Sequence, residues 1–85
     1  MYSMQEAIRQ RIAPLMQERN LTISELARRA GLTQSTVNDI VKGKVKNPSM
    51  QAILQIADAL GLSIGEFTSH PLFENITRVP MKLNR

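Results

Sequence analysis

A run of polar and basic side chains lies between residues 34 and 47 of the 85-residue chain. It begins with groups that donate and accept hydrogen bonds, namely Gln34, Ser35, Asn38 and Asp39. It ends with three alternating lysines, Lys42, Lys44 and Lys46. Groups of the first kind can bond the edges of nucleobases, and lysine ammonium groups bind phosphates regardless of sequence. This pattern favours recognition of a polyanion over covalent catalysis.

Composition excludes several other kinds of chemistry. The chain has no cysteine, so it has no disulfide, thiolate metal site or cysteine nucleophile, as expected in a reducing compartment. One histidine and seven scattered acidic residues make no metal cluster or catalytic triad, so we expect no enzyme, metal or cofactor. No apolar run reaches the ~18 residues of a membrane span, and no signal peptide is visible. We therefore expect a cytoplasmic protein without a membrane or small-molecule ligand.

The positive charge is concentrated in the middle of the chain. The net charge is +4 and the sequence pI is about 10.1. Residues 21–48 carry a net +3, whereas residues 49–70 contain Asp58 and Glu66 and no Lys or Arg. The difference suggests a single basic working face and makes a polyanion the first partner to consider, although charge differences of this size also arise by chance.

The elements that must position these residues are five short helices, and no segment alternates with period two over a stretch long enough for a core strand. Capping-box spacing marks three helix starts, Ser3 to Glu6, Thr22 to Glu25 and Ser63 to Glu66. Thr33 and Ser49 are the expected caps of the third and fourth helices. Three glycines end the second, third and fourth helices, Gly31, Gly43 and Gly61. The sequence therefore predicts an all-α fold.

Apolar spacing predicts which sides of the helices face the core. In the first helix these positions are Met4, Ala7, Ile8, Ile12, Leu15 and Met16. In the fourth they are Met50, Ile53, Leu54, Ala57 and Leu60. Pro14 lacks an N–H and crowds the carbonyl of Gln10, so we expect a kink or a fresh start there.

Residues 22–43 have the spacing of two helices that cross at a tight turn. Small Ala27 lies four residues before Gly31, where a larger side chain would push the helices apart, and Val37 lies six residues after it. Gly31 supplies the left-handed turn. Such a pair meets at roughly 90–120° and presents its second helix to a duplex, which is the geometry of a helix-turn-helix reader.

The stretch from Leu21 to Phe67, LTISELARRAGLTQSTVNDIVKGKVKNPSMQAILQIADALGLSIGEF, resembles the helix-turn-helix domain of the Cro/cI family, of the xenobiotic-response-element type. The ordered features are ELA, Gly31, Thr33-Gln34, Gly43, Pro48 and IADALGLSIGEF. The resemblance implies a five-helix, lambda-repressor-like DNA-binding domain. Where the family often has a phosphate-binding Gln, this chain has Ile23, so that contact is absent or passes to Thr22 or Ser24.

The resemblance implies that the third helix reads bases in the major groove. Gln34 lies at the end that family members insert deepest, and its amide can bond adenine N6 and N7 together. The other base-reading candidates are Ser35, Asn38 and Asp39. Asp39 can accept a hydrogen bond from cytosine N4, or it can pair with Lys42 at i+3 without touching a base, which is the plainer interpretation.

In the same family the loop after the third helix lies along the phosphate backbone. Mobile lysines there give affinity without sequence information, and helix N-termini add backbone N–H donors. The phosphate-contacting candidates are Thr22, Ser24, Thr33, Thr36, Lys42, Lys44, Lys46 and Asn47.

The chain divides into a DNA-binding domain, residues 1–69, and a tail, residues 70–85. Within the tail, residues from Pro71 can form a helical turn, whereas Val79, Met81 and Leu83 alternate as in an extended arm. The tail can dock on its own subunit, join a dimer or lead into a further domain. His70 is expected to be a linker residue.

These features together predict a sequence-specific transcriptional regulator, a repressor of prophage Cro/cI type. It would bind an inverted-repeat operator as a homodimer, with the two third helices about 34 Å apart in successive major grooves. The alternative is an antitoxin, whose tail wraps a toxin while its helical body represses the operon.

Overall fold

Side-chain caps set where the helices of this protein begin. Five N-cap hydroxyls each accept a hydrogen bond from the backbone N–H three residues later, those of Ser3, Thr22, Thr33, Ser49 and Ser63. The three expected capping boxes are complete, because Glu6, Glu25 and Glu66 each accept a bond from the cap residue's N–H. Each cap typically stabilises its helix by about 1 kcal/mol.

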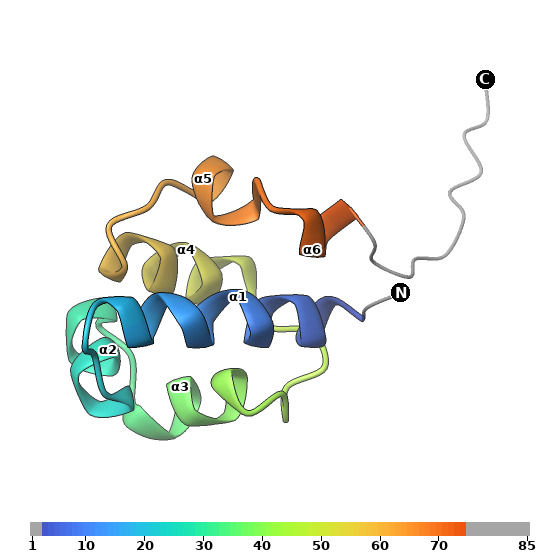
Figure 1. The fold of residues 1–85 in the computed structure, drawn as a ribbon. Helices are drawn as coiled ribbons and strands as arrows, with labels where there is room; N and C mark the ends of the chain where they lie inside the picture. Colours follow the sequence, from blue (N-terminus) through green and yellow to red (C-terminus); the bar gives the residue numbers. More distant parts are fainter. Residues whose placement is uncertain (1–2, 75–85) are drawn as a thin grey trace.

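The computed structural model describes residues 3–74, and within that range it has helices and no strand (Figure 1). The helices are α1 (Met4–Glu18), α2 (Ile23–Ala30), α3 (Gln34–Val41), α4 (Met50–Ala59), α5 (Ile64–Thr68) and α6 (Pro71–Glu74). The predicted all-α fold is confirmed, with a sixth helix beginning at Pro71 inside the predicted tail. The predicted arm at Val79, Met81 and Leu83 lies outside the described residues. No helix of the described chain is long and apolar enough to cross a membrane.

Helix α1 runs unbroken through Pro14, so the fresh start allowed by the sequence does not occur. Glu18 is its last residue, and Asn20, two residues further on, has a positive φ of 52°. Pro14 lies on the exposed side of α1. The loss of the helical hydrogen bond to the Gln10 carbonyl therefore costs less free energy than it would in the core.

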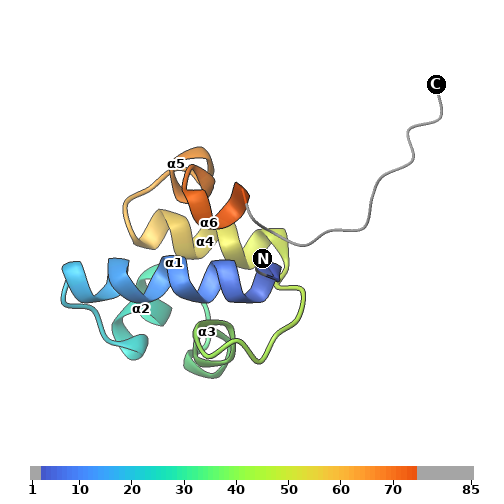
Figure 2. The same ribbon diagram turned by 45° about the vertical axis from the view of Figure 1, so that its right-hand side comes forward.

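Helices α1 and α4 lie between two groups of shorter helices (Figures 1 and 2). Helices α2 and α3 lie on one side, and α5 and α6 lie on the other. Seven large side chains fill the space between them and are fully buried, those of Phe67, Ile8, Ile12, Leu26, Ile56, Leu60 and Val37. The shared core fixes α3 relative to the rest of the fold.

The predicted inward positions were wrong at three residues. Met50 is 64% exposed, Leu54 40% and Met4 43%, whereas Ala52 and Ile56 are buried instead. Helix α4 is apolar around more than half of its circumference, so the period of its apolar residues does not specify one inner face. Ala52, Ile56 and Ala57 of this helix pack on the core, whereas Met50 and Leu54 remain outside.

Helix α6 packs against α1 and extends the core. The ring of Phe73 lies 6.0 Å from that of Phe67, tilted by 53°, a favourable aromatic geometry. His70 is more than a linker residue, because its Nδ1 accepts a hydrogen bond from the Leu72 N–H at the start of this helix. The division into residues 1–69 and 70–85 stays a prediction.

Arg11 of α1 holds the C-terminal end of α5, a role that the sequence does not reveal. Its Nε donates to the Phe67 carbonyl at 2.8 Å and its Nη2 to the Glu66 carbonyl at 3.0 Å. The guanidinium also lies 5.9 Å from the Phe67 ring centroid. A cation at a helix C-terminus satisfies carbonyls that have no partner within the helix.

Candidate nucleic-acid interface

The turn between α2 and α3 is closed by backbone hydrogen bonds around Gly31. Gly31 has φ 71°, its N–H donates to the Arg28 carbonyl at 3.3 Å, and the Leu32 N–H donates to the Ala27 carbonyl at 3.0 Å. This pair of bonds is a Schellman motif, which needs a left-handed residue at the glycine. Ala27 is 3% exposed, as expected for the point where the two helices cross.

A side chain of α4 is hydrogen-bonded to the same turn. Gln55 Nε2 donates to the Ala30 carbonyl at 2.7 Å, and Gln51 Nε2 donates to Gln55 Oε1 at 3.2 Å. A Cβ placed on Gly31 would lie 3.5 Å from Gln55 Nε2, so the amide fits closely against the turn. Gln55 thereby links α4 to the position of α3, a role that sequence spacing did not reveal.

The side of α3 opposite Val37 and Ile40 carries the predicted base-reading residues. Gln34 and Ser35 are exposed, and Asn38 and Asp39 are half-buried. Val37 and Ile40 are 0% and 3% exposed, which fixes the rotation of the helix. Within the described chain, none of the four polar side chains has a hydrogen-bond partner. Their donors and acceptors are therefore free for an external ligand.

The expected pairing of Asp39 with Lys42 is wrong. In the described part of the chain the only ion pair joins Arg19 and Glu18, at 3.6 Å. An exposed pair of this kind gains little energy while it costs side-chain entropy, so its absence is physically ordinary. The carboxylate of Asp39 remains an open acceptor on the outer side of α3.

The N-terminus of α3 is better suited to a phosphate than that of α2. The Thr33 hydroxyl donates to Thr36 Oγ1 at 2.8 Å and accepts from the Thr36 N–H at 3.1 Å. The hydroxyl proton of Thr36 therefore stays available. The backbone N–H groups of Gln34 and Ser35 have no acceptor among the described residues, and no acidic residue occupies this first turn.

The capping box of α2 occupies groups that a phosphate would need. The Thr22 hydroxyl and N–H both donate to Glu25 Oε1, at 3.1 and 3.0 Å. The hydrogen bond from the Thr22 backbone N–H is the larger cause, and that from the Thr22 hydroxyl the second, of a lowered pKa of Glu25. Both bonds favour the anionic carboxylate, which repels a phosphate. Ser24 is exposed and its hydroxyl is unpaired in the described structure, so it is the better phosphate donor of the two.

The loop after α3 alternates lysines with an inward valine. Lys42 and Lys44 are exposed, as are Lys46 and Asn47, whereas Val45 packs on the core. Gly43 has φ 72°, and the bonds from Gly43 N–H to Ile40 and from Lys44 N–H to Asp39 close a second Schellman motif. Lys42 and Lys44 thus flank the glycine turn at which α3 ends.

Arg9 adds a cation that sequence spacing did not reveal. A Cβ on Gly43 would lie 3.3 Å from Arg9 Cδ and 3.4 Å from its Nε, so this side chain of α1 lies against the start of the basic loop. Arg9 makes no ion pair within the described chain. The net charge of residues 1–20 is only +1, so composition gave no signal for it.

A helix packed across its predecessor through a left-handed glycine turn, with an unpaired polar side and a basic loop after it, defines a helix-turn-helix DNA-binding domain. The ligand of such a domain is DNA. The sequence profile of the Cro/C1-type HTH DNA-binding domain matches residues 11–71, and the chain belongs to that family. The resemblance seen in the sequence is therefore confirmed.

One solved structure similar to this chain is the crystal structure of the prophage Lp1 protein 11. The two share 33% sequence identity and superpose with a TM-score of 0.75. The match covers 89% of this chain and 100% of that one. No curated protein sequence matches the chain significantly.

Proposed function

We propose that this protein is a transcriptional repressor of prophage Cro/cI type that binds an inverted-repeat operator as a homodimer. The observation that carries the proposal is the row of unpaired polar side chains on α3, directly followed by the exposed lysines of the loop. Such a surface combines base recognition with phosphate binding on one face. The similarity to a prophage protein supports the phage-type role. A repressor of this type would act in the cytoplasm of a bacterium.

The base contacts are assigned to Gln34, Ser35, Asn38 and Asp39. Gln34 is at the exposed N-terminal end of α3, where its amide can bond an adenine bidentately. Asp39, having no cation partner in the described structure, accepts from a cytosine amine. Each good bidentate contact discriminates against a wrong base by ~1–3 kcal/mol.

The phosphate contacts are assigned to the edges of the same face. The residues are Thr22, Ser24, Thr33, Thr36, Lys42, Lys44, Lys46 and Asn47. Ser24 takes the larger part at α2, because the hydroxyl of Thr22 is bonded to Glu25. At α3 the donors are the Thr36 hydroxyl and the first-turn N–H groups, with Thr33 holding the turn in place.

Selection from a pool of random duplexes tests this function, because it requires no assumption about the operator sequence. The protein is expected to enrich an inverted repeat with half-sites about one helical turn apart, near 34 Å. Light scattering of the complex should give two chains per duplex. Enrichment of no motif at all, or of an unrepeated site bound by one chain, contradicts the proposal.

An antitoxin remains the second candidate because a separate apolar surface exists. Met4, Met50 and Leu54 are exposed large hydrophobic side chains, and they belong to α1 and α4 rather than to the predicted reading helix. A toxin bound at such a surface would leave α3 free for DNA. Co-purification of a small partner encoded by the neighbouring gene supports this role, and its failure to bind favours the repressor.

A further inference from the structure

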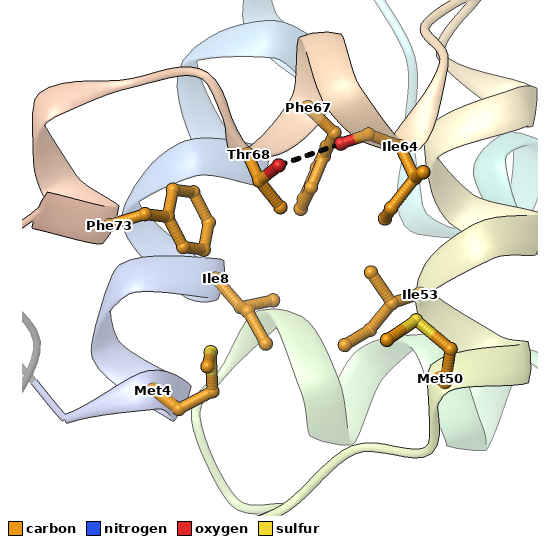
Figure 3. A pocket seen from close by; sticks show the side chains of 8 residues that line it. All are labelled: Met4, Ile8, Met50, Ile53, Ile64, Phe67, Thr68 and Phe73. Atoms are coloured by element: carbon orange, nitrogen blue, oxygen red, sulfur yellow. Dashed lines mark hydrogen bonds between the residues drawn. The ribbon is translucent and has the colours of Figure 1, made fainter. Parts of the chain in front are cut away.

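Arg9 and Arg11 are half-buried arginines of α1 that reach opposite sides of the helix. Successive residues of an α-helix are turned by about 100°, so side chains two positions apart point in nearly opposite directions. Arg11 bonds the carbonyls of Glu66 and Phe67 in α5, and Phe67 lines an apolar pocket between α1, α4, α5 and α6 (Figure 3). Arg9 instead reaches the end of α3, on the side of the nucleic-acid interface (Figures 1 and 2).

The guanidinium of Arg9 makes neither a hydrogen bond nor an ion pair with residues 3–74. Glu6, three residues earlier on α1, is engaged by Ser3, whose N–H and hydroxyl donate to its Oε1 at 3.0 and 3.1 Å. These bonds, from the backbone N–H first and the hydroxyl second, are the main causes of the lowered pKa of Glu6, and the charge of Arg9 contributes less. Asp39 of α3 forms no ion pair within the described chain either. The five N–H donors of the Arg9 guanidinium are therefore open to an external anion.

The stem of Arg9 lies against Gly43. A Cβ on Gly43 would lie 3.3 Å from Arg9 Cδ and 3.4 Å from its Nε, so the missing side chain of the glycine leaves the room that the stem occupies. The two terminal nitrogens lie more than 4 Å from the same point. A stem that is already packed loses less conformational freedom when its charged end binds a ligand.

The position of Gly43 brings Arg9 to the two lysines at the start of the basic loop. Lys42 and Lys44 flank Gly43 in the chain, are exposed and make no ion pair among residues 3–74. Helix α1 packs against α3, so this arrangement belongs to the fold. Like charges gathered at one turn repel one another, and a phosphate strand beside α3 supplies the opposite charge.

We propose that Arg9 contacts a phosphate of double-stranded DNA, on the strand that borders the C-terminal end of α3. The inference rests on the proposed function and extends the contact surface to α1, outside the helix-turn-helix pair and its loop. The major groove is ~12 Å wide and a helix with its side chains is ~10–12 Å across, so phosphates flank a helix in the groove. The planar guanidinium can bond two phosphate oxygens at once, which an ammonium group cannot.

The substitution Arg9→Met removes the charge and keeps an unbranched apolar stem on Gly43. In titrations of a fluorescein-labelled shuffled duplex at several salt concentrations, it should reduce the slope of log K against log salt by about one unit. Its free energy of unfolding in urea should equal that of the wild type. Arg11→Met is the matched control from the same helix, and it should lower stability but leave the salt slope unchanged.

Ethylation interference on the selected operator locates the contact. Ethylation of a phosphate removes its negative charge, so it weakens binding wherever the protein contacts that phosphate. Arg9→Met should become insensitive to ethylation at one phosphate per half-site and stay sensitive at the others. Arg9→Lys, which restores the charge, should regain sensitivity at the same phosphate.

Failure of this assignment is distinguishable from failure of the proposed function. If Lys44→Ala reduces the salt slope but Arg9→Met changes neither the slope nor the ethylation pattern, only the role of Arg9 is overturned. A loss of stability with equal weakening at every phosphate also overturns it, because Arg9 then only holds α3 in place. A wild type that binds no duplex overturns the proposed function and this inference together.

Discussion

The side-chain amide of Gln55 lies 2.7 Å from the carbonyl oxygen of Ala30, the last residue of α2. Gln55 belongs to α4, so a helix outside the helix-turn-helix pair secures the turn that sets the direction of α3. A carbonyl at a helix C-terminus has no partner within the helix, and this bond satisfies it. The position of the reading helix thus depends on a residue that touches no DNA in the proposed contact set.

Replacing Gln55 tests this link. Gln55→Leu keeps the approximate volume but leaves the Ala30 carbonyl unpaired in a half-buried site, so the free energy of unfolding should fall by ~1–2 kcal/mol. DNA affinity should fall as well, because the turn that leads into α3 loses a hydrogen bond that helps to hold it in place. Gln51→Leu is the matched control, since Gln51 is exposed and bonds only Gln55. Equal effects of the two substitutions in urea unfolding and DNA titration would contradict the link.

Lys44 provides a test of phosphate binding. Lys44→Ala should weaken binding to all duplexes by a similar factor and reduce the slope of log K against log salt by about one unit. Arg29→Ala is the matched control, because it removes the same charge from an exposed residue at the far end of α2. A loss of affinity confined to one sequence, or an unchanged salt slope, argues against the assigned phosphate contact.

Gly31 is required by its backbone conformation. Its φ of 71° is costly for a residue with a Cβ, so Gly31→Ala should lower the free energy of unfolding by ~1–2 kcal/mol. Gly65→Ala is the comparison, because Gly65 lies in α5 without a positive φ and has only Ser63 Oγ near its Cβ position, at 3.8 Å. Thermal unfolding followed by circular dichroism should therefore separate the two variants clearly.

The capping boxes predict a loss of stability in acid. Bonds from the backbone N–H and then the hydroxyl of the cap residue lower the pKa values of Glu6, Glu25 and Glu66 below 4.5. A carboxyl whose folded pKa is depressed contributes stability above its unfolded pKa, and loses it as pH falls through the folded value. The melting temperature should therefore be flat near neutral pH and fall below about pH 4.5.

Glu25→Gln separates the charge from the cap. Glutamine can still accept from the Thr22 N–H but does not titrate, so its variant should show a shallower fall of melting temperature in acid. An acid dependence identical to that of the wild type would mean that Glu25 does not contribute to it.

Features of the fold were predictable from the sequence where a residue type has a single local structural role. Capping hydroxyls and the glycine at position 31 follow from nearest-neighbour rules and are confirmed. The burial of Val37 and Ile40 agrees with their helical spacing. These rules fix the rotation of α3, so they also place the candidate base-reading residues on its outer side. Local chemistry was therefore sufficient to outline the interface.

Contacts between distant segments were not predictable in the same way. Three such contacts are those of Arg9 with Gly43, Arg11 with α5 and Gln55 with Ala30. They depend on how the helices cross, and the spacing of residues along the sequence does not encode that. The prediction of the inner face of α4 failed for another reason. The apolar residues of this helix surround more than half of its circumference, so they do not specify one inner face. The Asp39 pairing failed because an i+3 spacing permits an exposed ion pair without making it favourable.

Base reading by α3 is tested most directly by a fluorescence titration of the wild type and Gln34→Ala against the selected operator and a shuffled duplex of equal length. We expect the wild type to prefer the operator. Gln34→Ala should lose ~1–3 kcal/mol of this preference per half-site while its binding to the shuffled duplex is unchanged. Equal discrimination by the two proteins, or equal affinity of the wild type for both duplexes, would contradict the claim that α3 reads the sequence of DNA.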